Sequence, residues 1–139
     1  MTDQRAKAET LAALHAPGDP VLLANVWDIP SARIVAAAGY PALATSSAGC
    51  AWALGYADGQ GIDRAQMMDW CGRIAASVDL PVTFDLENGY GDEPEEVATC
   101  VAQMIETGGV GCNIEDSDGL TGHSVYGYDM AVMRIAAMS

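Results

Sequence analysis

The hydrophobic positions of this chain fall into short, nearly continuous runs, separated by longer stretches in which apolar residues recur with helical spacing. Runs of this kind are typical of strands that are covered on both faces, as in parallel sheets. The pattern predicts four buried strands, at Val21–Val26, Pro41–Ser46, Pro81–Leu86 and Val110–Glu115.

Helical patterns occupy the segments around the first two predicted strands. The N-terminal stretch MTDQRAKAETLAALHA is polar and amphipathic, and we expect it to form a helix. Ser31 is expected to cap the helix ARIVAAAG, which stops at Gly39, and Asp63 to cap the helix RAQMMDWCGRIAASV. The first half of the chain is therefore expected to alternate helix and strand.

The second half continues the alternation. Asp92, with Glu95 three residues later, resembles a capping box for a helix that ends at Gly108, and Asp129 is expected to begin a last helix. One helix followed by four strand–helix repeats predicts an α/β chain, and right-handed crossovers make its sheet parallel. No linker or repeat divides the chain, so we expect residues 1–139 to form a single domain.

Composition and charge narrow the classes of partner. The chain has 139 residues and a formal net charge of −13, so nucleic acid and anionic membrane surfaces are not expected to be partners. No apolar run approaches the roughly 20 residues of a membrane helix. The N-terminus also lacks the apolar core of a signal peptide, which favours a cytoplasmic location.

The spacing of the cysteines and glycines argues against a zinc site, a disulfide framework and a Rossmann-type nucleotide site. Four cysteines, at positions 50, 71, 100 and 112, form no C-x-x-C pair and no cluster with histidine. A structural zinc site or a disulfide framework is therefore not expected, and buried reduced thiols are the better interpretation. A Rossmann-type nucleotide binder is also disfavoured, because no G-x-G-x-x-G follows the first strand.

Oxygen-bearing side chains follow all four predicted strands. Since the carboxyl ends of parallel strands meet at one edge of a sheet, these side chains are expected to converge there. Taken singly, each group also fits a solvated loop, a helix cap or a small-residue turn. Together they suit a hard cation such as Mg²⁺, which prefers oxygen ligands and takes one or two carboxylates directly. The residues are Asn25, Asp28, Thr45, Ser46, Ser47, Asp85, Glu87, Asn113, Glu115 and Asp116.

The stretch TFDLENGYGDEPEE is the most acidic of these strand ends. Asp85 and Glu87 stand two residues apart, and in a strand such residues share a face. We therefore expect one of them to ligate the metal while the other holds a coordinated water. Asp58, in LGYADGQG, has an alternative explanation as part of a D-G turn.

Four segments carry a resemblance to a known family. In this order and spacing, NVWDIPSARIVAAAGYPALATSSAG, LGYADGQG, PVTFDLENGYGDEPEEV and GCNIEDS closely resemble the isocitrate lyase/phosphoenolpyruvate mutase superfamily. The resemblance covers nearly the whole chain. It implies about four βα units of a (β/α)₈ TIM-type barrel after an N-terminal helix, that is, the N-terminal half of such a barrel.

The resemblance also implies an activity. Members of the superfamily are Mg²⁺-dependent and make or break a C–C or P–C bond beside an α-oxo acid, through an enolate-like intermediate that the metal stabilises. The implied cofactor here is Mg²⁺, with Mn²⁺ as an alternative ion, and the implied partner is a small α-oxo or carboxylic acid. A homo-oligomer is implied for the full-length family.

The same resemblance assigns roles to residues. It implies that Asp85 binds the metal directly, while Asp58, Glu87 and Glu115 hold the metal's waters. It further implies substrate contacts with the carboxylate and oxo group, made by Ser46, Ser47, Ala48, Trp27 and Asn113. Among these residues Ser46, Ser47, Asp58 and Glu115 are also candidates for the catalytic machinery.

The chain departs from the family in two ways. The loop after the fourth strand, SDGLTGHSVYGYD, lacks the Lys and Cys of the lyases, so His123 is the candidate general acid/base, with an exposed loop histidine as the alternative. A (β/α)₈ barrel typically needs about 250 residues. We therefore expect a fragment or truncated gene product, unless two copies pair to close a barrel. The alternative to an enzyme is a catalytically incomplete fragment that only binds metal or a small acid, or packs against a partner.

Overall fold

Four parallel strands lie side by side in the order of the sequence. The computed structural model describes residues 3–59, 61–117 and 124–139. Each strand pairs with the next, and Ala24 stands opposite Leu43, which begins the second strand. The parallel sheet is thus confirmed, although each strand is shorter than its apolar run. The strands are β1 (Ala24–Val26), β2 (Leu43–Thr45), β3 (Val82–Asp85) and β4 (Gly111–Asn113).

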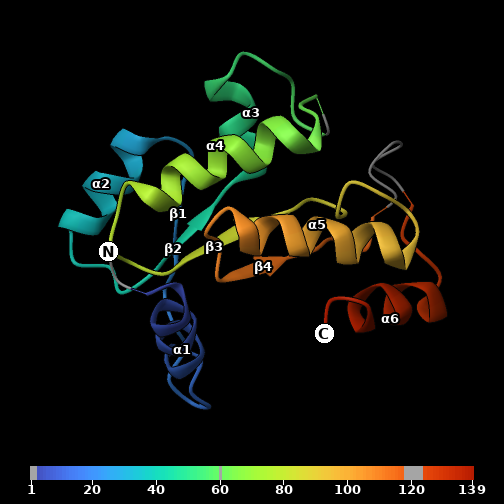
Figure 1. Ribbon diagram of the computed structural model, residues 1–139, viewed down its shortest axis with the longest axis horizontal. Coiled ribbons are helices and arrows are strands. Elements are labelled where there is room, and N and C mark those ends of the chain that lie inside the picture. The colour runs from blue at the N-terminus through green and yellow to red at the C-terminus, as the bar shows by residue number, and fades with distance from the viewer. Residues whose placement is uncertain (1–2, 60, 118–123) are drawn as a thin grey trace.

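The helices follow the strands along the chain. Figure 1 shows α2, α4, α5 and α6 side by side in a row that follows the order of the strands, and each packs against the next. This is the arrangement that right-handed strand–helix–strand crossovers produce. The helices are α1 (Gln4–Leu14), α2 (Ile29–Ala37), α3 (Ser47–Ala53), α4 (Arg64–Ala76), α5 (Pro94–Glu106) and α6 (Tyr128–Ala136).

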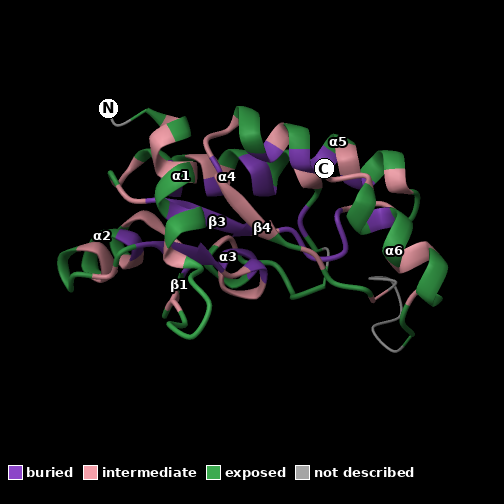
Figure 2. Cartoon of the chain, turned by 90° about the horizontal axis from the view of Figure 1, so that it is seen from below, coloured by how far each residue is buried: buried purple, intermediate pink, exposed green. Residues whose placement is uncertain are grey.

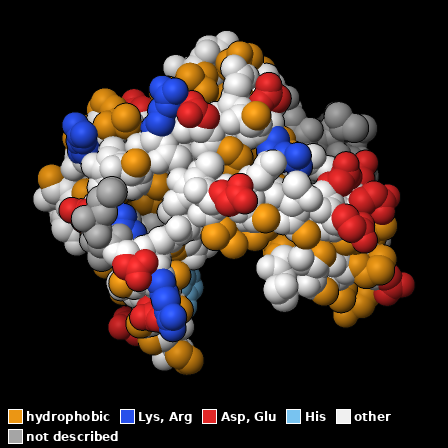
Figure 3. Space-filling model, in the orientation of Figure 1, with side chains coloured by type: hydrophobic (Ala, Val, Ile, Leu, Met, Phe, Trp, Pro, Cys, Tyr) orange, Lys and Arg blue, Asp and Glu red, His pale blue; other side chains and the backbone are white. Residues whose placement is uncertain are grey.

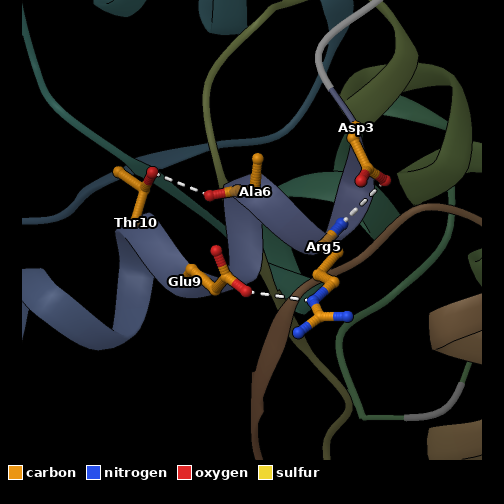
Figure 4. Close-up of polar contacts among 5 residues, drawn as sticks. All are labelled: Asp3, Arg5, Ala6, Glu9 and Thr10. Atoms are coloured by element: carbon orange, nitrogen blue, oxygen red, sulfur yellow. Dashed lines mark hydrogen bonds and ion pairs between the residues drawn. The ribbon is translucent and has the colours of Figure 1, made fainter.

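Helix α1 is stabilised by local polar contacts (Figure 4). Asp3 caps its first turn by accepting a hydrogen bond from the Arg5 N–H, at 3.2 Å. Arg5 pairs with Glu9 at 3.0 Å on the exposed surface, four residues apart, and Thr10 donates to the carbonyl of Ala6. An exposed pair of this kind contributes only a few tenths of a kcal/mol.

Longer contacts hold α1 against the rest of the molecule. Gln4 Nε2 donates to the carbonyl of Ile105 at the end of α5, and Lys7 Nζ donates to the carbonyl of Val78 after α4. Leu11 is buried beneath the helix. Both carbonyls precede a strand, so α1 lies at the amino end of the sheet, opposite the edge where the polar strand ends gather.

The cap predicted for α4 is confirmed, whereas the cap of α2 lies elsewhere. The Asp63 carboxylate accepts from the Gln66 N–H, at 2.9 Å. For α2 the cap is Asp28, not Ser31: Asp28 accepts from the Ser31 N–H at 2.7 Å, and the Ser31 hydroxyl accepts from the Asp28 N–H. The reciprocal pair begins the helix three residues earlier than the prediction.

The start of α5 also differs by one residue. Its cap is Glu93, and the Glu93 N–H donates to the Glu96 carboxylate at 3.0 Å. Pro94 accounts for the shift, because the residue before a proline avoids helical backbone angles. Asp92 instead accepts from the hydroxyl of Tyr126, at 2.6 Å.

Two further helix starts differ from the predictions. The last helix begins at Tyr128, and Asp129 lies in its first turn. Helix α3 is absent from the predicted elements, because its sequence SAGCAWA is short and rich in small residues. Ser46 caps α3 by accepting from the Gly49 N–H, at 3.2 Å. The chain thus inserts a short helix directly after β2.

The core lies between the sheet and the row of helices. Figure 2 shows buried residues along β3 and on the inward sides of α4 and α5, and β2 is buried throughout. Cys50, Cys71 and Cys100 are buried free thiols, as predicted, and Cys112 is half-buried. Burial raises the pKa of the Cys100 thiol to about 11. Over the described residues, none of the helices has the length and apolar character to cross a membrane.

Candidate metal and substrate site

The carboxylate of Asp85, at the carboxyl end of β3, accepts hydrogen bonds from three segments. Ser47 donates to its Oδ2 through both the N–H (2.9 Å) and the hydroxyl (2.7 Å). The Asn113 amide and the Glu87 N–H each donate to its Oδ1, at 3.2 Å. The Asp85 N–H in turn donates to the buried hydroxyl of Thr45. The ends of β2, β3 and β4 therefore meet at this one carboxylate.

Ser47 reaches Asp85 because α3 begins directly after β2. The Ser46 N–H donates to the Val26 carbonyl at 3.1 Å, which ties the end of β2 to β1. Gly49 permits a close approach here, since a Cβ at that position would lie 2.8 Å from the Cβ of Trp27. Both donors of Ser47 point at Asp85, so the hydroxyl and amide that are expected to contact the substrate hold the carboxylate in this structure.

Glu87 does not share a face with Asp85 in the way the strand pattern predicted. Strand β3 ends at Asp85, and Glu87 has a left-handed φ of 50°, so the alternation of a strand no longer applies. The Glu87 side chain is buried and accepts from the Tyr90 hydroxyl, at 3.4 Å. Burial, followed by the charge of Glu87, raises the pKa of Tyr90 above its ordinary value.

The end of β4 lies beside the end of β3. The Glu115 N–H donates to the Glu87 carbonyl at 2.7 Å, and the exposed Glu115 carboxylate accepts from the Ser117 hydroxyl. Asn113 is exposed and contacts Asp85 directly. Glu115 thus belongs to the same edge, with its carboxylate turned toward its own loop.

None of the other predicted site residues that the structure describes forms a hydrogen bond with the Asp85 carboxylate. Asp58 is exposed and accepts only a local bond that the structure records, from the Gly59 N–H at 2.8 Å. Trp27 and Ser46 line a cleft of about 510 Å³ together with Asn25, Gly49, Trp52 and Ala53. Ala48 lies half-buried in the first turn of α3. The predicted acid/base His123 falls outside the described residues.

The donor set can be compared with the needs of Mg²⁺. Within residues 3–59, 61–117 and 124–139, no three His, Cys, Asp or Glu side chains are grouped closely enough to hold a metal ion. Mg²⁺ keeps several waters and uses only one or two carboxylates, so it needs no such group. Asp85, with hydroxyl and amide oxygens of Ser47 and Asn113 beside it, fits that requirement as a single direct ligand.

Sequence patterns missed a second polar cluster beside the site. Arg134 of α6 is 1% exposed, and it lies against the ring of Tyr126 and the loop that follows β3. An arginine inside the apolar pattern MAVMRIAAMS was the available signal. The pattern was assigned only to a helix, because a lone charge in a helix is usually exposed.

Known proteins resemble this chain in sequence and in fold. The family model for phosphoenolpyruvate phosphomutase matches residues 11–139. A Burkholderia cenocepacia J2315 protein, provisionally named a phosphonomutase, has a crystal structure that is 49% identical with a TM-score of 0.91, covering 95% of this chain and 53% of that one. The structure of an oxaloacetate acetylhydrolase with its product oxalate is 29% identical with a TM-score of 0.85, covering 95% and 47%.

A curated relative gives the same picture. A Corynebacterium glutamicum protein, provisionally named 2-methylisocitrate lyase 2, is 32% identical over 132 residues, which is 91% of this chain and 42% of that protein. The chain spans about two fifths of the length of the curated relatives that it matches, and about half of the solved structures. Those structures are of the TIM-barrel type, and the four parallel strands correspond to one half of such a barrel.

Proposed function

Because this chain belongs to the phosphoenolpyruvate mutase/isocitrate lyase superfamily, we propose that the edge around Asp85 is the Mg²⁺ site of a lyase or phosphonomutase-like enzyme. The bond made or broken is a C–C or P–C bond beside an α-oxo acid. The observation that carries the proposal is the convergence of three segments on the Asp85 carboxylate, through Ser47, Asn113 and Glu87.

The chemistry follows from the residues at this edge. A bound Mg²⁺ supplies a Lewis acid that stabilises the negative charge developing on the oxo group. The four hydrogen bonds to Asp85 orient its carboxylate before the ion arrives, and pre-organised ligands need little rearrangement on binding. Asp85 would hold the ion, and the Ser47 hydroxyl beside it would be placed to donate to the substrate.

The substrate would enter through the cleft beside Ser46. Trp27 and Trp52 form its apolar walls, while Asn25 and Ser46 supply polar groups. Ser46 is followed by Ser47, which contacts Asp85, so the cleft and the metal edge adjoin. A small acid with an apolar substituent matches this combination of walls.

Calorimetric titration of the purified chain with Mg²⁺ and oxalate tests the proposal. Oxalate mimics the enolate of pyruvate, and we expect it to bind only when Mg²⁺ is present. In Asp85→Asn the affinity should fall by about a hundredfold, because the direct carboxylate ligand is lost. The Arg73→Gln variant is a surface control, since its salt bridge to Asp69 is exposed. Absence of binding by the folded wild-type chain would contradict the proposal.

A second candidate is a chain that binds metal and acid without turnover. It is supported by the Asp85 edge itself, whose hydrogen-bonded carboxylate could hold an ion and a small acid without further catalytic groups. Assays with oxaloacetate, phosphonopyruvate and 2-methylisocitrate separate the two. Product formation that disappears in Asp85→Asn supports the enzyme, and Mg²⁺–oxalate binding without turnover supports the binding-only chain.

We further propose a cytoplasmic location and a homo-oligomeric state for this protein. The acidic composition is compatible with the first, and the exposed apolar residues of α6, Tyr128, Val132 and Ile135, support an association at that face. Light scattering during size-exclusion chromatography measures the oligomeric state. A monomer at all concentrations would remove the oligomer from the proposal.

A further inference from the structure

The loop after β3, residues 87–93, leaves the strand through an unfavourable backbone path. Glu87 and Tyr90 have left-handed φ values of 50° and 57°, and Gly89 has a φ of 85°. For residues with a side chain, this conformation is strained, because the Cβ atom lies too close to the backbone carbonyl. A loop of this kind keeps its shape only when surrounding contacts determine it.

Arg134 provides such contacts from a helix more than forty residues away in the sequence. Its Nη1 donates to the carbonyls of Gly91 (2.7 Å) and Asp92 (2.5 Å), and its Nη2 donates to the carbonyl of Asn88. A guanidinium presents several N–H groups in a rigid plane, so one side chain can hold three carbonyls in fixed directions. A lysine at this position cannot reproduce that geometry.

Tyr126 completes the tether on the other side of the guanidinium. The guanidinium carbon of Arg134 (Cζ) lies 4.1 Å from the centre of the Tyr126 ring. At this distance the face of an aromatic ring attracts a cation. The Tyr126 hydroxyl accepts from the Asn88 amide at 3.2 Å and donates to the Asp92 carboxylate at 2.6 Å. The loop is therefore held at both its side chains and its backbone.

From this arrangement we infer that Arg134 is a positioning residue that fixes the loop 87–93, and with it Glu87, relative to the Asp85 carboxylate. The path is short, since Asn88 follows Glu87, whose N–H donates to Asp85 Oδ1 at 3.2 Å. The inference rests on the proposed function of the Asp85 edge. It assigns α6, which contributes no ligand, the task of keeping that edge in shape.

The test measures amide hydrogen exchange of residues 87–93 and the Mg²⁺–oxalate dissociation constant. In Arg134→Gln we expect exchange in the loop to rise at least about tenfold while β2 and β3 stay protected. The dissociation constant should rise about tenfold, with a smaller rise in Arg134→Lys, which keeps the charge and one donor. The control is again Arg73→Gln, the same substitution on an exposed surface.

Tyr126→Phe protects the test against a variant that fails to fold. It removes the two hydroxyl contacts but keeps the ring over the guanidinium, and it should loosen the loop by a smaller factor than Arg134→Gln. Unchanged exchange in both Arg134→Lys and Tyr126→Phe would overturn the inference, as would a loosened loop with an unchanged dissociation constant. A folded wild-type chain that fails to bind Mg²⁺–oxalate overturns the proposed function instead, whatever the exchange of the loop.

Discussion

Two aspartates, each beside a glycine-containing turn, have opposite surroundings in this molecule. Asp85 is half-buried and accepts four hydrogen bonds from three segments of the chain. Asp58 is exposed and accepts from the N–H of the next residue, Gly59. Both were candidates for the metal site, and their local sequences, D-L-E-N-G and A-D-G-Q-G, look similarly acidic and flexible.

The comparison shows that hydrogen bonds from several segments of the chain, and not the local number of acidic residues, distinguish a preorganised site from an acidic turn. Most of the acidic side chains gathered near the start of α5 in Figure 3 face solvent, although the local charge there is high. Asp85, by contrast, has fixed donors on both of its oxygens. A carboxylate held in this way is ready for an ion, whereas an exposed one pays entropy to adopt any single geometry.

Asp85→Asn is expected to have the largest effect, because it removes the carboxylate that distinguishes this site from the turn at Asp58. An amide places an N–H₂ against either the Ser47 donors or the Glu87 N–H, so at least one charge-assisted bond becomes a clash of donors. We expect the free energy of unfolding to fall by roughly 2–3 kcal/mol, measured by urea denaturation without metal. An unchanged stability would mean that these hydrogen bonds do not form in solution.

Thr45→Val should have the next largest effect. The substitution leaves the Asp85 N–H without the hydroxyl that accepts from it at 2.9 Å in a buried position. Unfolding should become easier by about 1–2 kcal/mol, and Thr45→Ser, which keeps the oxygen, should recover most of that loss. Equal stability of the Val and Ser variants would contradict the role of the hydroxyl.

Raising the pH should lower the free energy of unfolding through Tyr90, which follows β3, and not through the turn at Asp58. Burial and the charge of Glu87 raise the pKa of Tyr90 in the folded state. The contribution of Tyr90 to the free energy of unfolding is therefore complete below the ordinary tyrosine pKa near 10, and it is lost as the pH rises above that value. Urea denaturation at pH 9, 10 and 11 should show a steeper loss for the wild type than for Tyr90→Phe. Parallel curves would rule out this linkage.

Asp58→Asn is expected to have the smallest effect and so to sharpen the comparison. Because its carboxylate is exposed, stability should change by no more than about 0.5 kcal/mol. The Mg²⁺–oxalate dissociation constant should change less than about threefold, against about a hundredfold for Asp85→Asn. A larger change in calorimetry would mean that Asp58 takes part in the metal site, in keeping with the resemblance, which implies that it holds the metal's waters.

Much of the fold was predictable because it depends on local patterns. The parallel sheet followed from four apolar runs, and Asp63 was found as a cap because capping involves residues three apart. The predicted helix caps Ser31 and Asp92 were wrong because neighbouring polar residues compete to cap the same helix start. At the second of these helices, Pro94 decides which residue is the cap. Helix α3 was missed because it has only seven residues, most of them small, and shows no helical period.

The sequence by itself determined the α/β class, the family and the edge of the sheet at which polar residues would gather, because each depends on periodicity or on motifs read along the chain. Only the tertiary structure decided that Ser47 and Asn113 hold Asp85, that Glu87 turns away through a left-handed residue, and that Arg134 supports its loop. Those contacts join residues that are 28 to 43 positions apart in the chain. Their geometry depends on how strands and helices pack, which no local pattern records.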